Sequence, residues 1–277
     1  MSENQNPLHI NTDLARKIIV GFIEREITRA GFSRAVLGLS GGVDSALSCL
    51  LTAEALGPEN VLALRMPYKS SSPESLEHAQ LIIDQSGVQE LSIPITDMVD
   101  AYLQKFHHAG QIRSGNVMAR VRMTILYDQS AAFNGLVVGT GNKTEILLGY
   151  TTLYGDSACA INPIGDLYKT QVRQLAYAVG VPEVIITKPP SADLWAGQTD
   201  EEELGLTYEE VDQLLFLLVD HRYSPEDCIA AGFDTGFVKD VLERIRRTQF
   251  KRVLPPIAKL SNRTVGYDFL YLRDWGT

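Results

Sequence analysis

The chain has 277 residues, of which 45% are hydrophobic and 21% charged, with a formal net charge of −9. This is ordinary globular composition with ample material for a core, and the negative charge argues against general affinity for nucleic acid or anionic membranes. The sequence has three widely spaced cysteines without a Cys-x-x-Cys pair, no signal-peptide pattern at its start, and no apolar run near a membrane span of about 18 residues, so we expect a soluble protein of the reducing cytoplasm.

Helical and strand-like patterns follow one another along the chain. Residues 1–10 are polar and expected to be a loose end, and residues 11–30 carry apolar side chains at helical spacing. The short apolar run 36–39 predicts a buried strand, from which small residues lead into a helix. The elements expected after it are strands over 60–68, 89–95 and 135–142, helices over 73–85, 97–109 and 115–133, and a helix that ends at Gly180.

Strands that alternate with helices predict a Rossmann-like α/β fold, a parallel, doubly wound sheet with helices on both faces. Ligands of such sheets bind at the carboxyl ends of the strands, near the switch in strand order. Gly-rich turns follow the predicted strands at 36–39 and 135–142. We therefore expect both turns to face the same crevice.

The segment 188–207 differs from the sequence around it. It begins with Lys-Pro-Pro and then mixes glycine, aspartate and threonine with several acidic residues before helical periodicity returns near Tyr208. Such a stretch is typical of a long mobile loop that acts as a lid. The alternative is a solvated linker.

The turn after the first strand reads Ser-Gly-Gly-Val-Asp-Ser. It lacks the lysine of a Walker A loop and resembles the loop of enzymes that split ATP between its α- and β-phosphates. Gly41 and Gly42 allow the backbone to close around phosphate oxygens, and Ser40 and Ser45 offer hydroxyl donors. Asp44 repels phosphate, so its carboxylate is useful there only if a cation lies between the two.

Three further stretches, NVMARVRMTILY, VVGTGNKTEILLGYTTLYGD and INPIGDLYKTQVRQLA, together resemble the synthetase domain of NAD synthetase. The resemblance runs from about residue 10 to residue 256. It implies a single domain over 1–277, with the adenine nucleotide alpha-hydrolase fold of N-type ATP pyrophosphatases. It also implies adenylation of the carboxylate of deamido-NAD (nicotinic acid adenine dinucleotide) by ATP with Mg²⁺, displacement of AMP by ammonia, and a homodimer.

The same resemblance assigns roles to residues. It implies that Asp44 and Glu145 are magnesium ligands and that they act with Lys169 in catalysis. It implies ATP contacts from Gly38, Leu39, Ser40, Gly41, Gly42, Val43, Asp44, Ser45, Arg65, Thr140, Lys169 and Ser191. It implies contacts to deamido-NAD from Asn116, Arg120, Tyr127 and Lys251.

Taken singly, several of these residues have purely structural interpretations. Glu145 suits the first turn of a helix, where acids are favoured, and Arg120 suits a solvated helix face. Their joint occurrence in the family's order is what favours the functional interpretation. The chain also departs from many bacterial members, since Leu153 and Ala160 replace a lysine and an aspartate usually assigned to deamido-NAD.

Other functions remain open on the sequence. One is a different adenylating ligase of the same loop class that acts on another carboxylate or carbonyl substrate. Another is a sensor that binds ATP without cleaving it. The three cysteines fall inside the synthetase-like pattern and nothing in the sequence resembles a glutamine-hydrolysing domain, so we expect free ammonia or a separate supplier.

Overall fold

Four parallel strands form the centre of the molecule. The computed structural model describes residues 7–106, 110–191, 193–195, 197 and 199–268. The strands pair in parallel in the order β3-β2-β1-β4, and their bounds are Ala35–Gly38 for β1, Val61–Arg65 for β2, Gln89–Ser92 for β3 and Leu136–Val137 for β4. Strand β1 has the predicted length and is shifted by one residue, whereas β2, β3 and β4 are shorter than the runs that predicted them, because the residues at the carboxyl ends of those runs leave the sheet.

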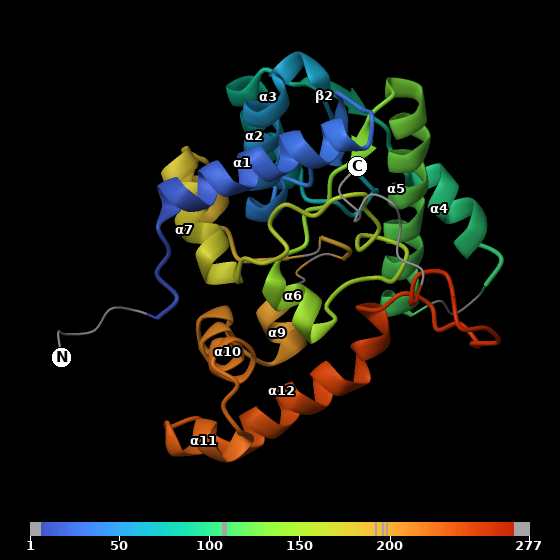
Figure 1. The fold of residues 1–277 in the computed structure, drawn as a ribbon. Coiled ribbons are helices and arrows are strands. Elements are labelled where there is room, and N and C mark those ends of the chain that lie inside the picture. The colour runs from blue at the N-terminus through green and yellow to red at the C-terminus, as the bar shows by residue number, and fades with distance from the viewer. Residues whose placement is uncertain (1–6, 107–109, 192, 196, 198, 269–277) are drawn as a thin grey trace.

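Successive residues of the central strands face opposite helical layers. Ala35 and Leu37 of β1 belong to one apolar core, whereas Val36 of β1 and Leu64 of β2 belong to another. The first core includes helices α1 (Thr12–Arg29), α2 (Val43–Leu56), α3 (Pro73–Ser86) and α7 (Lys169–Val179), and the second includes α4 (Thr96–Leu103) and α5 (Gln111–Phe133). Helices therefore cover both faces of the sheet (Figure 1), and the predicted doubly wound fold is confirmed.

The strand order changes direction beside β1. The chain builds β1, β2 and β3 outward and then returns to place β4 on the other side of β1. Helix α2 starts directly after β1, and α6 (Lys143–Leu148) starts shortly after β4. The two Gly-rich turns thus lie at the switch point of the sheet, where α/β proteins bind their ligands.

A third apolar core lies outside the sheet. It joins α6 to helices from the C-terminal part of the chain and includes Leu148, Tyr208, Leu214 and Val238. The remaining helical elements are α8 (Glu183–Ile186), α9 (Asp200–Leu204), α10 (Tyr208–Leu215), a π-helical turn (Phe216–Asp220), α11 (Pro225–Ala230), α12 (Thr235–Arg247) and the 3₁₀ turns Pro58–Asn60 and Gln249–Lys251. Figure 1 shows α10, α11 and α12 gathered below the sheet. Among the described residues, no helix is both long and apolar enough to cross a membrane.

Several elements differ from the sequence predictions. Leu8, placed in a loose end, is 1% exposed and belongs to the third core, because its apolar side chain finds a site beside the C-terminal helices. Helix α4 ends at Leu103, and part of its predicted remainder, residues 107–109, lies outside the described residues. Helix α5 starts at Gln111, before its predicted start. The segment 188–207 contains the unpredicted helix α9, and its mobility stays a prediction.

Candidate active site

The Ser-Gly-Gly turn between β1 and α2 is shaped by its own side chains. The Ser40 and Ser45 hydroxyls lie 3.0 Å apart, and the Ser45 hydroxyl donates to the Gly42 carbonyl at 3.0 Å. Gly41 has φ +82°, and a Cβ there would lie 2.1 Å from the Ser75 carbonyl oxygen, so the position requires glycine. Gly42 precedes α2 without a side-chain cap, which leaves the first N–H groups of the helix to an anion. Contact between the two hydroxyls and a phosphate stays a prediction.

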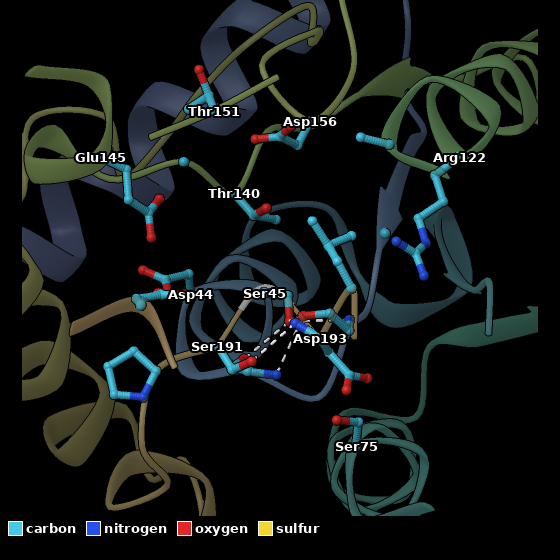
Figure 2. A pocket seen from close by; sticks show the side chains of 18 of the residues that line it. Asp44, Ser45, Ser75, Arg122, Thr140, Glu145, Thr151, Asp156, Ser191 and Asp193 are labelled. Carbon is cyan, nitrogen blue, oxygen red and sulfur yellow. Dashed lines mark hydrogen bonds between the residues drawn. The ribbon is translucent and has the colours of Figure 1, made fainter. Parts of the chain in front are cut away.

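The three predicted catalytic residues meet at the ends of three helices. Lys169, the first residue of α7, donates to Asp44 Oδ2 at 2.5 Å and to Glu145 Oε1 at 3.4 Å. Asp44 and Glu145 lie in the first turns of α2 and α6 and face one another in Figure 2. The Asn142 side-chain amide donates to Asp44 Oδ1 at 2.9 Å. Asn142 and Glu145 also exchange hydrogen bonds as a capping box at the start of α6.

Burial and charge together set the protonation of this group. Burial alone would lower the pKa of Lys169, but the negative charges of Asp44 and Glu145 outweigh it, so the pKa lies above its ordinary value. Burial raises the pKa of Glu145, opposed by the charge of Lys169 and assisted by that of Asp44. Lys169 is therefore a buried cation that reduces the repulsion between two carboxylates.

The two carboxylates fit a magnesium ion. Mg²⁺ prefers oxygen ligands and is usually bound through one or two carboxylates together with waters and substrate phosphates. Asp44 and Glu145 present such a pair to the same cavity, close to the helix start that suits a phosphate. The donor chemistry of the site thus agrees with the predicted magnesium ligands.

A cavity of about 720 Å³ opens beside this group, at the carboxyl ends of the strands. Every residue predicted to bind ATP lines it except Gly41, whose backbone shapes the loop. Figure 2 shows Thr140 and Ser191 on its wall together with Asp44 and Glu145. Arg65 also lines the cavity, but its guanidinium donates to side chains of α3 and β3, to Gln80 at 2.8 Å and to Glu90 at 2.6 Å.

Three of the four residues predicted to bind the dinucleotide converge on the loop 149–153. Asn116 Oδ1 accepts from the Thr152 hydroxyl at 2.7 Å. Arg120 donates to the carbonyl of residue 153 at 3.2 and 3.3 Å, and Lys251 donates to the carbonyls of residues 149 and 151, both at 2.7 Å. Asn116 and Lys251 line the large cavity, and Arg120 lines a second one beside α5 together with Asn116. Tyr127 lines neither of these two cavities and is 42% exposed.

The structure adds functional candidates that the sequence predictions did not include. Asn142 bonds both predicted magnesium ligands, and its Asn-x-x-Glu spacing is a capping pattern that could have identified it. Arg122 and Asp156 line the cavity and point into it in Figure 2. The Arg122 Nε donates to the Met66 carbonyl at 3.1 Å. Both residues lie within the stretches that carry the family resemblance, but helical spacing and turn chemistry do not show that the fold brings them to the cavity.

A turn that suits phosphate, two carboxylates that suit a divalent cation and a buried ammonium group lie together at the switch point of a parallel sheet. These features define a nucleotide-dependent α/β enzyme of the adenine nucleotide alpha-hydrolase type. The model of the NAD synthase family matches residues 15–255. The chain belongs to the NAD synthase family.

Similar proteins agree with this assignment over nearly the full chain. The NH(3)-dependent NAD(+) synthetase of Trichlorobacter lovleyi is 60% identical over 269 residues, which cover 97% of this chain and 98% of that protein. The structure of the NH3-dependent NAD synthetase from Campylobacter jejuni, in complex with nitrate, has 33% identity and a TM-score of 0.77, and covers 90% of this chain and 100% of that one. The structure of NMN synthetase from Francisella tularensis has 29% identity and a TM-score of 0.82, and the match covers 91% of this chain and 100% of that one.

Proposed function

We propose that this chain catalyses the ATP-dependent amidation of deamido-NAD to NAD with ammonia and releases AMP and pyrophosphate. The observation that carries the proposal is the meeting of Asp44, Glu145 and Lys169 beside the phosphate-binding turn. Membership of the NAD synthase family and 60% identity to an NH(3)-dependent NAD(+) synthetase support it.

The first step activates a carboxylate. A carboxylate oxygen of deamido-NAD attacks the α-phosphate of ATP, the bond to the β-phosphate breaks, and an acyl adenylate and pyrophosphate form. Asp44 and Glu145 would hold a Mg²⁺ ion, which when bound would neutralise charge on the leaving pyrophosphate. Lys169 contributes a fixed positive charge, and the N–H groups at the start of α2 contribute oriented donors. This route needs no side-chain nucleophile.

In the second step neutral ammonia attacks the acyl carbon and AMP leaves. The acyl adenylate is exposed to hydrolysis, so water must be kept out. Segment 188–207 suits that role, since Lys188 donates to the Ser75 hydroxyl at 3.1 Å and Asp193 accepts from the Ser72 N–H at 3.2 Å. These contacts connect the segment to the start of α3 across the cavity wall.

We extend the proposal to the state of the protein in the cell. The chain acts as one synthetase domain, forms a homodimer and works in the cytoplasm on small-molecule substrates. Sedimentation of the purified protein tests the dimer, and a monomer at micromolar concentration that is fully active would contradict it.

The experiment that tests the reaction is pyrophosphate release from Mg-ATP, deamido-NAD and ammonium, with each component omitted in turn. We expect release only when the dinucleotide is present, and NAD as product only when ammonium is present. Release with another carboxylic acid but not with deamido-NAD would support the ATP chemistry and contradict the proposed substrate. ATP binding without release under any condition would indicate a sensor.

One observation favours a second substrate. NMN synthetase from Francisella tularensis matches all of its own length to this fold, and this chain lacks the usual lysine and aspartate at Leu153 and Ala160. The acid precursor of NMN, a mononucleotide, is therefore included as a competing substrate. A higher kcat/KM for the mononucleotide than for deamido-NAD would show that the mononucleotide is the preferred substrate.

A further inference from the structure

A fully buried carboxylate lies behind the active site, on α10. Asp212 is 0% exposed and shares the buried side of this helix with Val211, Leu214 and Leu215. A carboxylate in apolar surroundings is unfavourable unless hydrogen bonds compensate it. Asp212 does not line the large cavity, so direct contact with a substrate there does not explain it.

Both oxygens of Asp212 accept hydrogen bonds from the helices that carry the catalytic residues. Oδ1 accepts from the Thr144 hydroxyl at 2.5 Å, and Oδ2 accepts from the Thr170 N–H at 2.8 Å. The Thr144 hydroxyl accepts in turn from the Lys169 N–H at 3.0 Å. Thr144 is also 0% exposed and directly precedes Glu145.

Two of these bonds satisfy unpaired N–H groups at the start of α7, and the third comes from a side chain in the first turn of α6. Thr144 stands in the first turn of α6, and Lys169 and Thr170 begin α7, where backbone N–H groups have no partner within their own helix. A negative charge is favoured at such ends. One carboxylate and one hydroxyl therefore join two helix starts and determine how far Glu145 lies from Lys169.

We propose that Asp212 and Thr144 are positioning residues, which hold Glu145 and Lys169 in their places relative to Asp44. Neither residue touches substrate in this assignment. The kinetic part of the proposal rests on the proposed function, whereas its structural part depends on the fold alone.

The first test replaces the hydroxyl and keeps the shape of the side chain. In Thr144→Val we expect kcat for pyrophosphate release to fall about 10- to 100-fold, the size of effect that a small misplacement of reacting groups produces. The KM for ATP should change by less than about threefold, because the contacts made in binding are kept. The magnesium concentration for half-maximal activity should rise. Thr144→Ser keeps the hydroxyl and should restore most of kcat.

A matched control is available on α2. Thr52 is also 0% exposed, and its hydroxyl donates to the Ser48 carbonyl at 2.6 Å, two helical turns beyond the active-site loop. Thr52→Val makes the same chemical change and should lower the melting temperature without lowering kcat. A loss of kcat in Thr144→Val no larger than in Thr52→Val would overturn the proposal.

Hydrogen exchange gives a readout that does not require activity. In Asp212→Asn and Thr144→Val, the peptide that contains Lys169 and Thr170 should exchange faster than in the wild type, and peptides of α1 should not change. Unchanged exchange in both variants would overturn the proposal even if catalysis were lost. A wild-type protein without pyrophosphate release would instead reject the proposed function, and exchange would then decide the structural claim.

Discussion

The two turns that meet at the switch point are held in place in different ways. The turn after β1 is shaped by hydrogen bonds among Ser40, Gly42 and Ser45, which lie within five residues of one another. The start of α6, after β4, has the local capping box of Asn142 and Glu145 and in addition a bond from far along the chain, to Asp212 at a separation of 68 residues. The end of α6 is held by Arg252, whose guanidinium donates to the Ile146 carbonyl at a separation of 106 residues.

The difference follows from the length of the elements. Helix α6 has six residues, too few to be stable alone in water. Its final carbonyls accept from Arg252 at 2.7 Å on Leu147 and from Arg244 at 3.2 Å on Leu148, so C-terminal side chains satisfy groups that the helix leaves open. The position of Glu145 therefore depends on the folded C-terminal region as well as on its capping box, whereas the loop that leads to Asp44 is shaped by its own residues.

The largest effect is expected at Asp44, the residue through which the two turns contact each other. Asp44 lies just after the Ser-Gly-Gly turn, and its carboxylate accepts hydrogen bonds from Asn142 and Lys169, which are about a hundred residues further along the chain. Asp44→Asn keeps the shape and removes the charge, so we expect pyrophosphate release to fall by about a thousandfold. The melting curve serves as the control and should remain a single cooperative transition. Retention of a tenth of the wild-type rate would show that Asp44 is not essential.

The local turn can be tested with a pair of adjacent glycines. Gly41→Ala places a Cβ 2.1 Å from the Ser75 carbonyl oxygen at φ +82° and should lower the free energy of unfolding by about 1–3 kcal/mol, with a matching loss of ATP affinity. Gly42 has φ −88°, and its Cβ would meet Ser40 Oγ at 3.5 Å, so Gly42→Ala should cost less than about 1 kcal/mol. Urea unfolding measures both. Equal losses would contradict a role for the close approach to Ser75.

The remote side can be tested with a pair of arginines. Arg252→Met keeps the stem but removes the donors to the carbonyls of α6, so we expect a loss of about 1–3 kcal/mol in unfolding free energy and a severalfold lower kcat. Arg16 forms an exposed pair with Glu54 at 2.8 Å. Arg16→Met should therefore cost less than about 1 kcal/mol and leave kcat unchanged. A similar kcat in Arg252→Met and Arg16→Met would contradict the claim that contacts from the C-terminal region to α6 support catalysis.

The same contrast explains which parts of the structure the sequence predicts. The apolar runs around Val36 and Leu64 and the pattern Ser-Gly-Gly-x-Asp-Ser act over a few residues, so they predict the doubly wound sheet and the first turn. The family resemblance names Glu145 and Lys169, which the structure brings together with Asp44.

What the sequence did not predict depends on tertiary contacts. Leu8 lies in a polar stretch of sequence but packs in the third core with the C-terminal helices. Asp212 lies in an amphipathic helix, and nothing in the sequence around it indicates its bonds to Thr144 and Thr170. Lys251 was predicted to bind the dinucleotide, and in this structure it donates to two carbonyls of the loop 149–153. Periodicity cannot report contacts between segments a hundred residues apart.

The last effect leaves catalysis unchanged at neutral pH and is confined to stability at alkaline pH. Burial raises the pKa of Cys49 on α2 from 9.0 to about 12. The folded protein then keeps the thiol proton through a range in which the unfolded chain loses it, so folding stability falls as pH rises from 9 toward 12. Cys49→Ala should reduce the slope of unfolding free energy against pH by about 1.4 kcal/mol per pH unit in this range.

A slope should remain in Cys49→Ala, because burial also raises the pKa values of Tyr168 and Tyr208 in the third core. These hydroxyls keep their protons in the folded state, and the unfolded chain loses them above pH of about 10. Urea unfolding of wild type and variant between pH 7 and about 11 separates the two contributions, and stability at pH 7 serves as the control for the cavity left by the thiol. An unchanged slope in Cys49→Ala would show that the buried thiol on α2 contributes nothing to the alkaline loss of stability.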